Sequence, residues 1–117
     1  MRILYVENHS RLARIVAAQY LSEHRVIVVP SLAEAREQLA ETGRADDPFA
    51  VVLLDYDLDD GKGDSLLPDL VKIMPRLRVV AVSSHQKGNE VLLQAGADAV
   101  CPKMELHTVA TFLSELV

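Results

Sequence analysis

The chain has 117 residues, of which half are apolar, and its formal net charge is -5. This length and composition suit one domain, residues 1–117, with a sizeable hydrophobic core. The basic residues are scattered along the chain, so the charge pattern does not indicate a surface for a phosphate backbone, and we do not expect direct binding of nucleic acid.

The N-terminus and the cysteine usage predict the compartment. The apolar run that follows Met1 is too short for a signal peptide or a membrane span. Cys101 is the only cysteine, which excludes an internal disulfide and a cysteine-based zinc site and fits a reducing compartment. We therefore expect a cytoplasmic protein that does not bind a membrane.

Apolar runs and helical patterns alternate from one end of the chain to the other, which predicts a series of strand–helix units. Ile3–Val6 is the first predicted strand. Asn8 and Ser10 are both suitable N-cap residues for the helix that follows. That helix has an apolar stripe at helical spacing, formed by Leu12, Ile15, Val16 and Tyr20.

The second unit begins with the apolar run Val26–Val29. Ser31 and Glu34 then have the spacing of a capping box, which predicts the start of a second helix. We expect this helix to end near Thr42 and Gly43, before a polar segment that leads to the third strand.

The third predicted strand, Ala50–Leu54, is apolar at every position and stops at an acidic, glycine-rich loop, Asp55–Asp64. A strand without alternation suits a parallel sheet that helices cover on both faces. The ligand crevice of such a sheet lies beyond the carboxyl ends of its strands. Because neighbouring acids repel one another unless a cation compensates, this loop indicates a divalent metal site.

The rest of the chain predicts a third helix and two further strand–helix units. Pro68 falls in the first turn of the third helix, where proline is tolerated, and Gly96 closes the fourth. In chain order, we expect a helix at 66–74, a strand at Leu77–Val82, a short helix at Asn89–Gln94 and a strand at Ala99–Cys101. The final helix has its apolar stripe at Leu106, Val109, Ala110, Leu113 and Leu116.

Five short strands that alternate with helices predict an α/β fold with right-handed crossovers. We predict a flavodoxin-like (βα)5 doubly wound sandwich with a five-stranded parallel sheet in the order 2-1-3-4-5. This order places the ends of the first and third strands side by side, so that residues after these strands share one rim.

Polar residues follow four of the five predicted strands. They are Glu7 and Asn8, Asp55, Ser83 and Ser84, and Pro102 and Lys103. This set resembles the receiver domain of two-component response regulators, and the resemblance covers essentially the whole chain. The family has an acidic pair after the first strand, a phosphoacceptor aspartate after the third, a hydroxyl residue after the fourth and a lysine after the fifth. The resemblance implies that Glu7 and Asn8 stand for the pair, Asp55 for the acceptor, Ser83 for the hydroxyl and Lys103 for the lysine.

Phosphoryl transfer to a carboxylate needs positioning and neutralisation of charge on the phosphoryl oxygens. Mg²⁺ suits this task because it accepts one or two carboxylates and keeps several waters. The resemblance implies Mg²⁺ ligands at Glu7, Asp55 and the backbone carbonyl of Asp57, with Asn8 as a weak or water-mediated ligand. Lys103 would contact one phosphoryl oxygen as a point charge, and the hydroxyl of Ser83 would donate a hydrogen bond to another.

Several positions depart from the family pattern, and three of them bear on the metal site and the switch. Asn8 replaces an acid that touches the metal, Val100 stands where an aromatic residue is common, and Met104 stands where proline is usual. The loss of an acid at Asn8 predicts weaker binding of Mg²⁺. His9 and His85 lie near the same predicted rim, but no HxxxH or HxH spacing supports a histidine metal site.

Three functions remain open on these observations. The first is a phosphorelay switch that accepts a phosphoryl group on Asp55 from a histidine kinase or phosphotransfer protein and presents an altered surface to a downstream protein partner. Such a switch promotes only its own phosphorylation and hydrolysis and is not otherwise an enzyme, and a homodimer is left open. The second is a receiver-like interaction module that is not phosphorylated, because its metal site is impaired. The third is a phosphatase that uses Asp55 and Asp57 as a DxD motif. This interpretation fits poorly, because the chain lacks the later acidic pair that such enzymes need.

Overall fold

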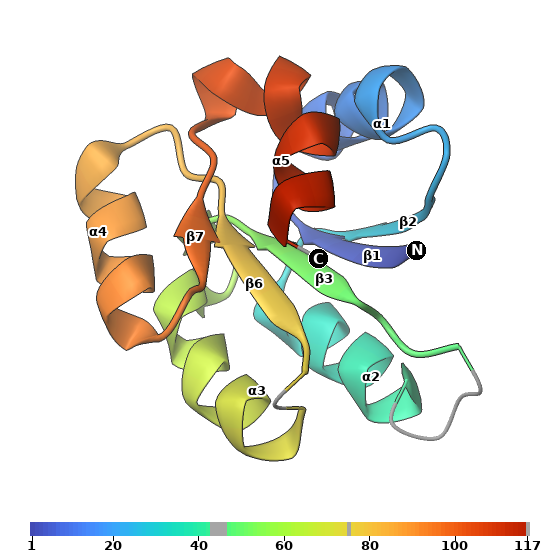
Figure 1. The fold of residues 1–117 in the computed structure, drawn as a ribbon. Coiled ribbons are helices and arrows are strands. Elements are labelled where there is room, and N and C mark those ends of the chain that lie inside the picture. The colour runs from blue at the N-terminus through green and yellow to red at the C-terminus, as the bar shows by residue number, and fades with distance from the viewer. Residues whose placement is uncertain (43–46, 75, 117) are drawn as a thin grey trace.

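The computed structural model describes residues 1–42, 47–74 and 76–116. Five parallel strands form one sheet in the order β2-β1-β3-β6-β7, which matches the predicted order 2-1-3-4-5 when only these five strands are counted (Figure 1). The predicted fold class is therefore confirmed. The strands are β1 Arg2–Val6, β2 Arg25–Val29, β3 Val51–Leu54, β6 Arg78–Ala81 and β7 Ala99–Val100.

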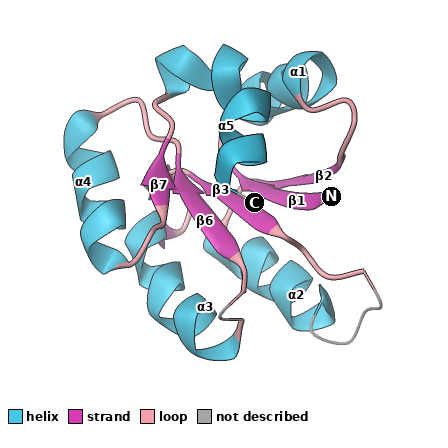
Figure 2. Ribbon diagram, in the orientation of Figure 1, coloured by secondary structure: helices cyan, strands magenta, loops and turns pink. Residues whose placement is uncertain are grey.

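Helices cover both faces of this sheet (Figure 2). Helices α1 and α5 lie on one face, and α2, α3 and α4 pack on the other. The α-helices are α1 Ser10–Tyr20, α2 Leu32–Thr42, α3 Leu67–Ile73, α4 Gln86–Ala95 and α5 Val109–Leu116, and the 3-10 helices are η1 Gly63–Leu66 and η2 Lys103–Thr108. Within the described ranges, no helix is long and apolar enough to cross a membrane.

Strand β3 is apolar and buried at every position, and β1 is apolar and buried from Ile3 to Val6, because helices cover both faces of these strands. In β1, Leu4 and Val6 join the core beneath α2, α3 and α4, whereas Ile3 and Tyr5 join the core beneath α1 and α5. This alternation follows from the two-residue period of a strand. Cys101 is buried in the second of these cores, where it packs as a small apolar residue.

The structure corrects several details of the helices. The N-cap of α1 is neither Asn8 nor Ser10 but His9, whose Nδ1 accepts a hydrogen bond of 3.1 Å from the amide of Leu12. Ile15 was expected in the buried stripe of this helix but is 45% exposed, and Ala13 is buried instead. The inner face of α1 is therefore formed by Ala13 and Val16, with Leu12 and Tyr20 packed against the same core.

The later helices also differ from their predicted bounds. Helix α4 begins at Gln86, earlier than expected, and Gly96 closes it with a φ of 123°. The final helix begins as η2 rather than as α-helix, and Ala110 is exposed, whereas Leu106 and Leu113 are buried. The expected end of the second helix at Gly43 lies outside the described residues.

The acidic loop contains a small hairpin that the sequence did not indicate. Strands β4, Asp57–Leu58, and β5, Gly61–Lys62, pair antiparallel directly after Asp55. The base of this hairpin is closed by a hydrogen bond of 2.6 Å from the amide of Gly63 to the carbonyl of Tyr56. A Cβ atom at Gly63 would lie 2.1 Å from the carbonyl oxygen of Asp55, so only glycine allows this approach.

The substitution Gly63→Ala should therefore destabilise the fold, because backbone must move away from the new methyl group. We expect the free energy of unfolding to fall by about 1–3 kcal/mol in urea denaturation. Asp59→Ala is the control, since Asp59 is exposed in the same loop. Equal stability of the two variants would contradict the close approach at Gly63.

Candidate functional site

The parallel register brings the residues after β1 and β3 together. Val6 is the partner of Leu54 in the β1–β3 ladder, so Glu7 and Asp55 are the next residues on neighbouring strands. Backbone hydrogen bonds continue this arrangement beyond the strands, from the amide of Asp55 to the carbonyl of Val6 at 3.0 Å and from the amide of Lys103 to the carbonyl of Ser83 at 3.4 Å. Four strand ends therefore meet at one rim of the sheet.

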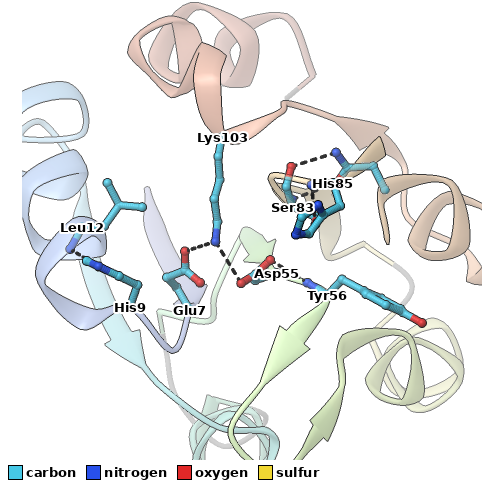
Figure 3. Close-up of polar contacts among 9 residues, drawn as sticks. Glu7, His9, Leu12, Asp55, Tyr56, Ser83, His85 and Lys103 are labelled. Atoms are coloured by element: carbon cyan, nitrogen blue, oxygen red, sulfur yellow. Dashed lines mark hydrogen bonds and ion pairs between the residues drawn. The ribbon is translucent and has the colours of Figure 1, made fainter. Parts of the chain in front are cut away.

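An ion triad of Glu7, Asp55 and Lys103 occupies this rim (Figure 3). The ammonium Nζ of Lys103 lies 2.6 Å from Oε1 of Glu7 and 3.1 Å from Oδ2 of Asp55. Glu7 is fully buried, Asp55 is 4% exposed, and the side chain of Lys103 is 18% exposed. One cation thus faces two buried carboxylates, which leaves the triad with one negative charge when both acids are ionised.

Burial and mutual repulsion perturb the protonation of this triad. Desolvation, together with the contact to Asp55, raises the pKa of Glu7 to about 7, although Lys103 opposes the shift. Burial by itself lowers the pKa of Lys103, but its contacts with Glu7 and Asp55 more than offset that effect, and the pKa is raised. Lys103 therefore stays charged, while Glu7 exchanges a proton near neutral pH.

Ser83, at the end of β6, is held in place by hydrogen bonds from neighbouring residues. Ser83 is 1% exposed, and the side chain of Asn89 brackets its backbone, since Oδ1 accepts from the amide at 2.8 Å and Nδ2 donates to the carbonyl at 2.9 Å. Oγ of Ser83 accepts a hydrogen bond of 3.1 Å from the amide of His85 (Figure 3). A Cβ atom at Gly88 would lie 2.9 Å from this Oγ. Asn89 and Gly88 were missed because nothing in their spacing marks them as supports for Ser83.

Two of the predicted metal ligands lie outside the triad. Asn8 is exposed, and the carboxylate of Asp57 is exposed and pairs with the ammonium of Lys62. Lys62 also lies over the ring of Tyr56, at 5.1 Å from its centroid. The side chain of Asp57 is thus already neutralised by Lys62, which leaves its backbone carbonyl as the group implied for the metal.

The two buried carboxylates fit a Mg²⁺ ion. Oε1 of Glu7 pairs with the ammonium of Lys103, whereas Oε2 is buried with no hydrogen-bond partner within the described part of the chain, so it keeps lone pairs for a cation. No group of three or more His, Cys, Asp or Glu side chains is placed to hold a metal in residues 1–42, 47–74 and 76–116. A site with two carboxylates suits Mg²⁺, which completes its octahedron with backbone oxygens and water. The histidine metal hypothesis gains nothing from this arrangement.

A buried hydroxyl lies near the triad. Tyr5, two residues before Glu7 on β1, is fully buried, and its Oη has no hydrogen-bond partner among the described residues. Burial first, and then the charges of Glu7 and Asp55, raise the pKa of Tyr5, so this phenol stays protonated. Tyr5 is thus a protonated phenol close enough to Glu7 and Asp55 to interact with their charges, and its apolar strand context gave no sign of this.

No protein-family model matches the chain, and no curated protein matches its sequence. Solved structures do match. A receiver domain protein from Methanospirillum hungatei is similar with a TM-score of 0.80 at 24% identity, over 98% of this chain and 91% of that one. The non-phosphorylated HemR receiver domain from Leptospira biflexa matches with a TM-score of 0.74 at 25% identity, over 98% and 90% of the two chains.

A third match is a response regulator protein from Burkholderia pseudomallei that contains a phosphorylated aspartic acid, a calcium ion and citrate. Its TM-score is 0.71 at 20% identity, over 98% of this chain and 71% of that one. These neighbours cover nearly the whole of this chain and share its five-stranded sheet. The chain therefore has the fold of the receiver domains of response regulators.

Proposed function

We propose that this chain is a phosphorelay receiver in which Asp55 accepts a phosphoryl group from a histidine kinase or a phosphotransfer protein. The observation that carries the proposal is the contact of 3.1 Å between Lys103 and Asp55 beside the buried carboxylate of Glu7. A carboxylate oxygen of Asp55 forms the new P–O bond while the P–N bond of a phosphohistidine donor breaks. The donor imidazole keeps the electron pair of that bond and takes up a proton.

The residues of the rim have separate tasks in this transfer. When the carboxylate of Asp55 becomes an acyl phosphate, it no longer carries the charge that pairs with Lys103. The ammonium of Lys103 then contacts a phosphoryl oxygen. The hydroxyl of Ser83 accepts from His85, so its own proton is available for a second phosphoryl oxygen. These contacts draw the segments after β6 and β7 toward Asp55, and their motion is the signal.

Glu7, Asp55 and the backbone carbonyl of Asp57 would hold Mg²⁺. The ion, when bound, supplies positive charge that neutralises the phosphoryl oxygens in the transition state. Lys103 must share the two carboxylates with the ion. Because Asn8 adds no charge, the chain has one acid fewer at this rim than the family pattern provides.

The proposed partners follow from the same geometry. A phosphodonor protein must reach the rim, and a downstream protein must detect the segments after β6 and β7. A groove of about 430 Å³ between α4 and β7 includes Ser84 and Leu93, and Leu93 is 48% exposed. This groove adjoins Ser83, so we assign it to the downstream protein or to a second copy in a homodimer.

A second candidate is a receiver-like module that binds partners without being phosphorylated. The exposure of Asn8 and the pairing of Lys103 with both acids favour it, because the ammonium already neutralises much of the charge that would attract a cation. Both candidates are switches or binding modules rather than enzymes that turn over an external substrate. Phosphorylation distinguishes them.

Incubation with acetyl phosphate and Mg²⁺ should add the mass of one phosphoryl group to the chain, and Asp55→Asn should abolish the addition. Intact mass spectrometry measures both outcomes. Asp57→Asn is the matched control, because it removes a neighbouring acid and leaves the acceptor intact. If the chain is not modified at millimolar Mg²⁺ and does not bind beryllofluoride, the result would support the unphosphorylated module instead.

Asn8→Asp should strengthen Mg²⁺ binding by roughly tenfold or more, because it restores a charged oxygen ligand to the rim. Tyrosine fluorescence during a Mg²⁺ titration reports the dissociation constant. Ser10→Asp is the control for charge alone, since Ser10 is exposed two residues further along. Equal gains in the two variants would remove position 8 from the metal site.

Glu7 makes the stability of the metal-free protein depend on pH. Its pKa is raised from 4.5 to about 7 on folding, so the folded state holds the proton more tightly than the unfolded state does. The resulting stability is present below pH 4.5 and is lost as the pH rises through 7. The free energy of unfolding should fall by on the order of 3 kcal/mol over this pH range in the unaltered chain, and Glu7→Gln should not show this fall.

Urea denaturation in EDTA between these pH values measures the effect, with Glu23→Gln as the control because Glu23 is an exposed carboxylate. The same pH profile for Glu7→Gln and for the unaltered chain would show that Glu7 does not titrate in this range.

A further inference from the structure

The N-terminus of α2 is capped by a residue from a distant part of the chain. Oδ1 of Asp60 accepts a hydrogen bond of 2.7 Å from the amide of Leu32, and Oδ2 accepts one of 3.0 Å from the amide of Ala33. The local capping box adds only the next amide, since Oγ of Ser31 accepts from the amide of Glu34 at 3.2 Å. Asp60 therefore satisfies two of the free amides that every helix leaves at its start.

Asp60 lies in the turn of the β4–β5 hairpin, and this hairpin packs against the same helix. Leu58 is buried in one core cluster with Leu32. A Cβ atom at Gly61 would lie 3.1 Å from Cδ1 of Leu32. The tip of the hairpin is thus held against α2 by two charge-assisted hydrogen bonds and by apolar contact.

The base of the hairpin is fixed to the phosphoacceptor segment. The amide of Gly63 donates to the carbonyl of Tyr56, and Gly63 lies against the backbone of Asp55. Oγ of Ser65 donates to the carbonyl of Lys62 at 2.8 Å. A hairpin of two residues in each strand is not stable by itself, so its position depends on these attachments at its two ends.

We propose that Asp60 is a positioning residue that holds the loop 56–62, and with it the backbone of Asp57, in register with Glu7 and Asp55. This inference rests on the proposed function, because the held backbone matters through the cation that it helps to bind. With Asn8 exposed, the chain has few rigid oxygen ligands, and a backbone carbonyl on a short hairpin contributes only if the hairpin does not move. Asp60 prevents that motion by anchoring the turn to α2.

The alternative is that Asp60 merely caps α2. A helix cap affects the stability of its helix, and its removal resembles the removal of any other cap. A positioning residue also affects the loop that carries it. Ser31→Ala is therefore a matched control, because it removes a cap from the same helix and leaves the hairpin attached. Asp59→Asn is the control for charge, since it removes one acid from the same turn.

The experiment compares Asp60→Ala and Asp60→Asn with these two controls in the full chain. Amide hydrogen exchange in EDTA follows the amides of residues 56–58 and 63, and a titration with Mg²⁺ alone gives the dissociation constant. Asp60→Ala should speed exchange of these amides and weaken Mg²⁺ binding at least about tenfold. Asp60→Asn, which keeps one acceptor oxygen, should restore part of both, while the controls stay within about twofold of the unaltered chain.

The outcomes separate the two proposals. Normal Mg²⁺ binding and normal loop exchange in Asp60→Ala would overturn the positioning role and leave the proposed function standing. Effects of the same size in Ser31→Ala would also overturn it, because they would come from α2 alone. Failure of the unaltered chain to bind Mg²⁺ would contradict the metal-assisted function itself, and with it any role of Asp60 toward the cation.

Discussion

The contact of one ammonium with two buried carboxylates is the interaction on which the rest of this site depends. Glu7 and Asp55 are adjacent because β1 and β3 are parallel neighbours, and their charges would repel at such burial without Lys103. Lys103 reaches them because β7 is parallel to β1 and β3 and ends at the same rim of the sheet. The parallel arrangement of the strands thus brings the cation and the two acids together.

The charge of the triad also explains how an asparagine at position 8 is compatible with a phosphoryl switch. With both acids ionised, the triad has one negative charge, and a divalent cation would give it one positive charge. A phosphoryl group of about -1.5 to -2 in place of the Asp55 charge then brings the rim close to neutral. A second acid in the pair would leave the phosphorylated rim negative. In the proposed switch, a neutral residue at position 8 would therefore keep the phosphorylated, metal-bound rim close to neutral, at the expense of affinity for the cation.

The strands and the rim could be predicted because they depend on strong and local signals. Uniform apolar runs mark the buried strands, and a polar residue at the end of each parallel strand must lie at the same rim. The hairpin at 57–62 carries no such signal, since aspartate and glycine disfavour strands and only two residues pair on each side. The bond from Asp60 to Leu32 joins residues that are 28 positions apart in the sequence, and no periodicity predicts it. His9 was missed as a cap because its ring rather than a short oxygen side chain accepts the bond.

The segments after β3, β6 and β7 are anchored in different ways, and the anchoring gives the proposed switch a direction. The segment after β3 is tied to α2 through Asp60, and the segment after β6 is bracketed by Asn89 of α4. The segment after β7 is joined to Ser83 by a long backbone bond of 3.4 Å from Lys103, and it continues into η2, in which Leu106 is buried in the core. Because a new charge on Asp55 would act on Lys103 directly, this segment is the one that phosphorylation would pull. The response should therefore run into η2, where the side chain of Met104 is 88% exposed and available to a partner.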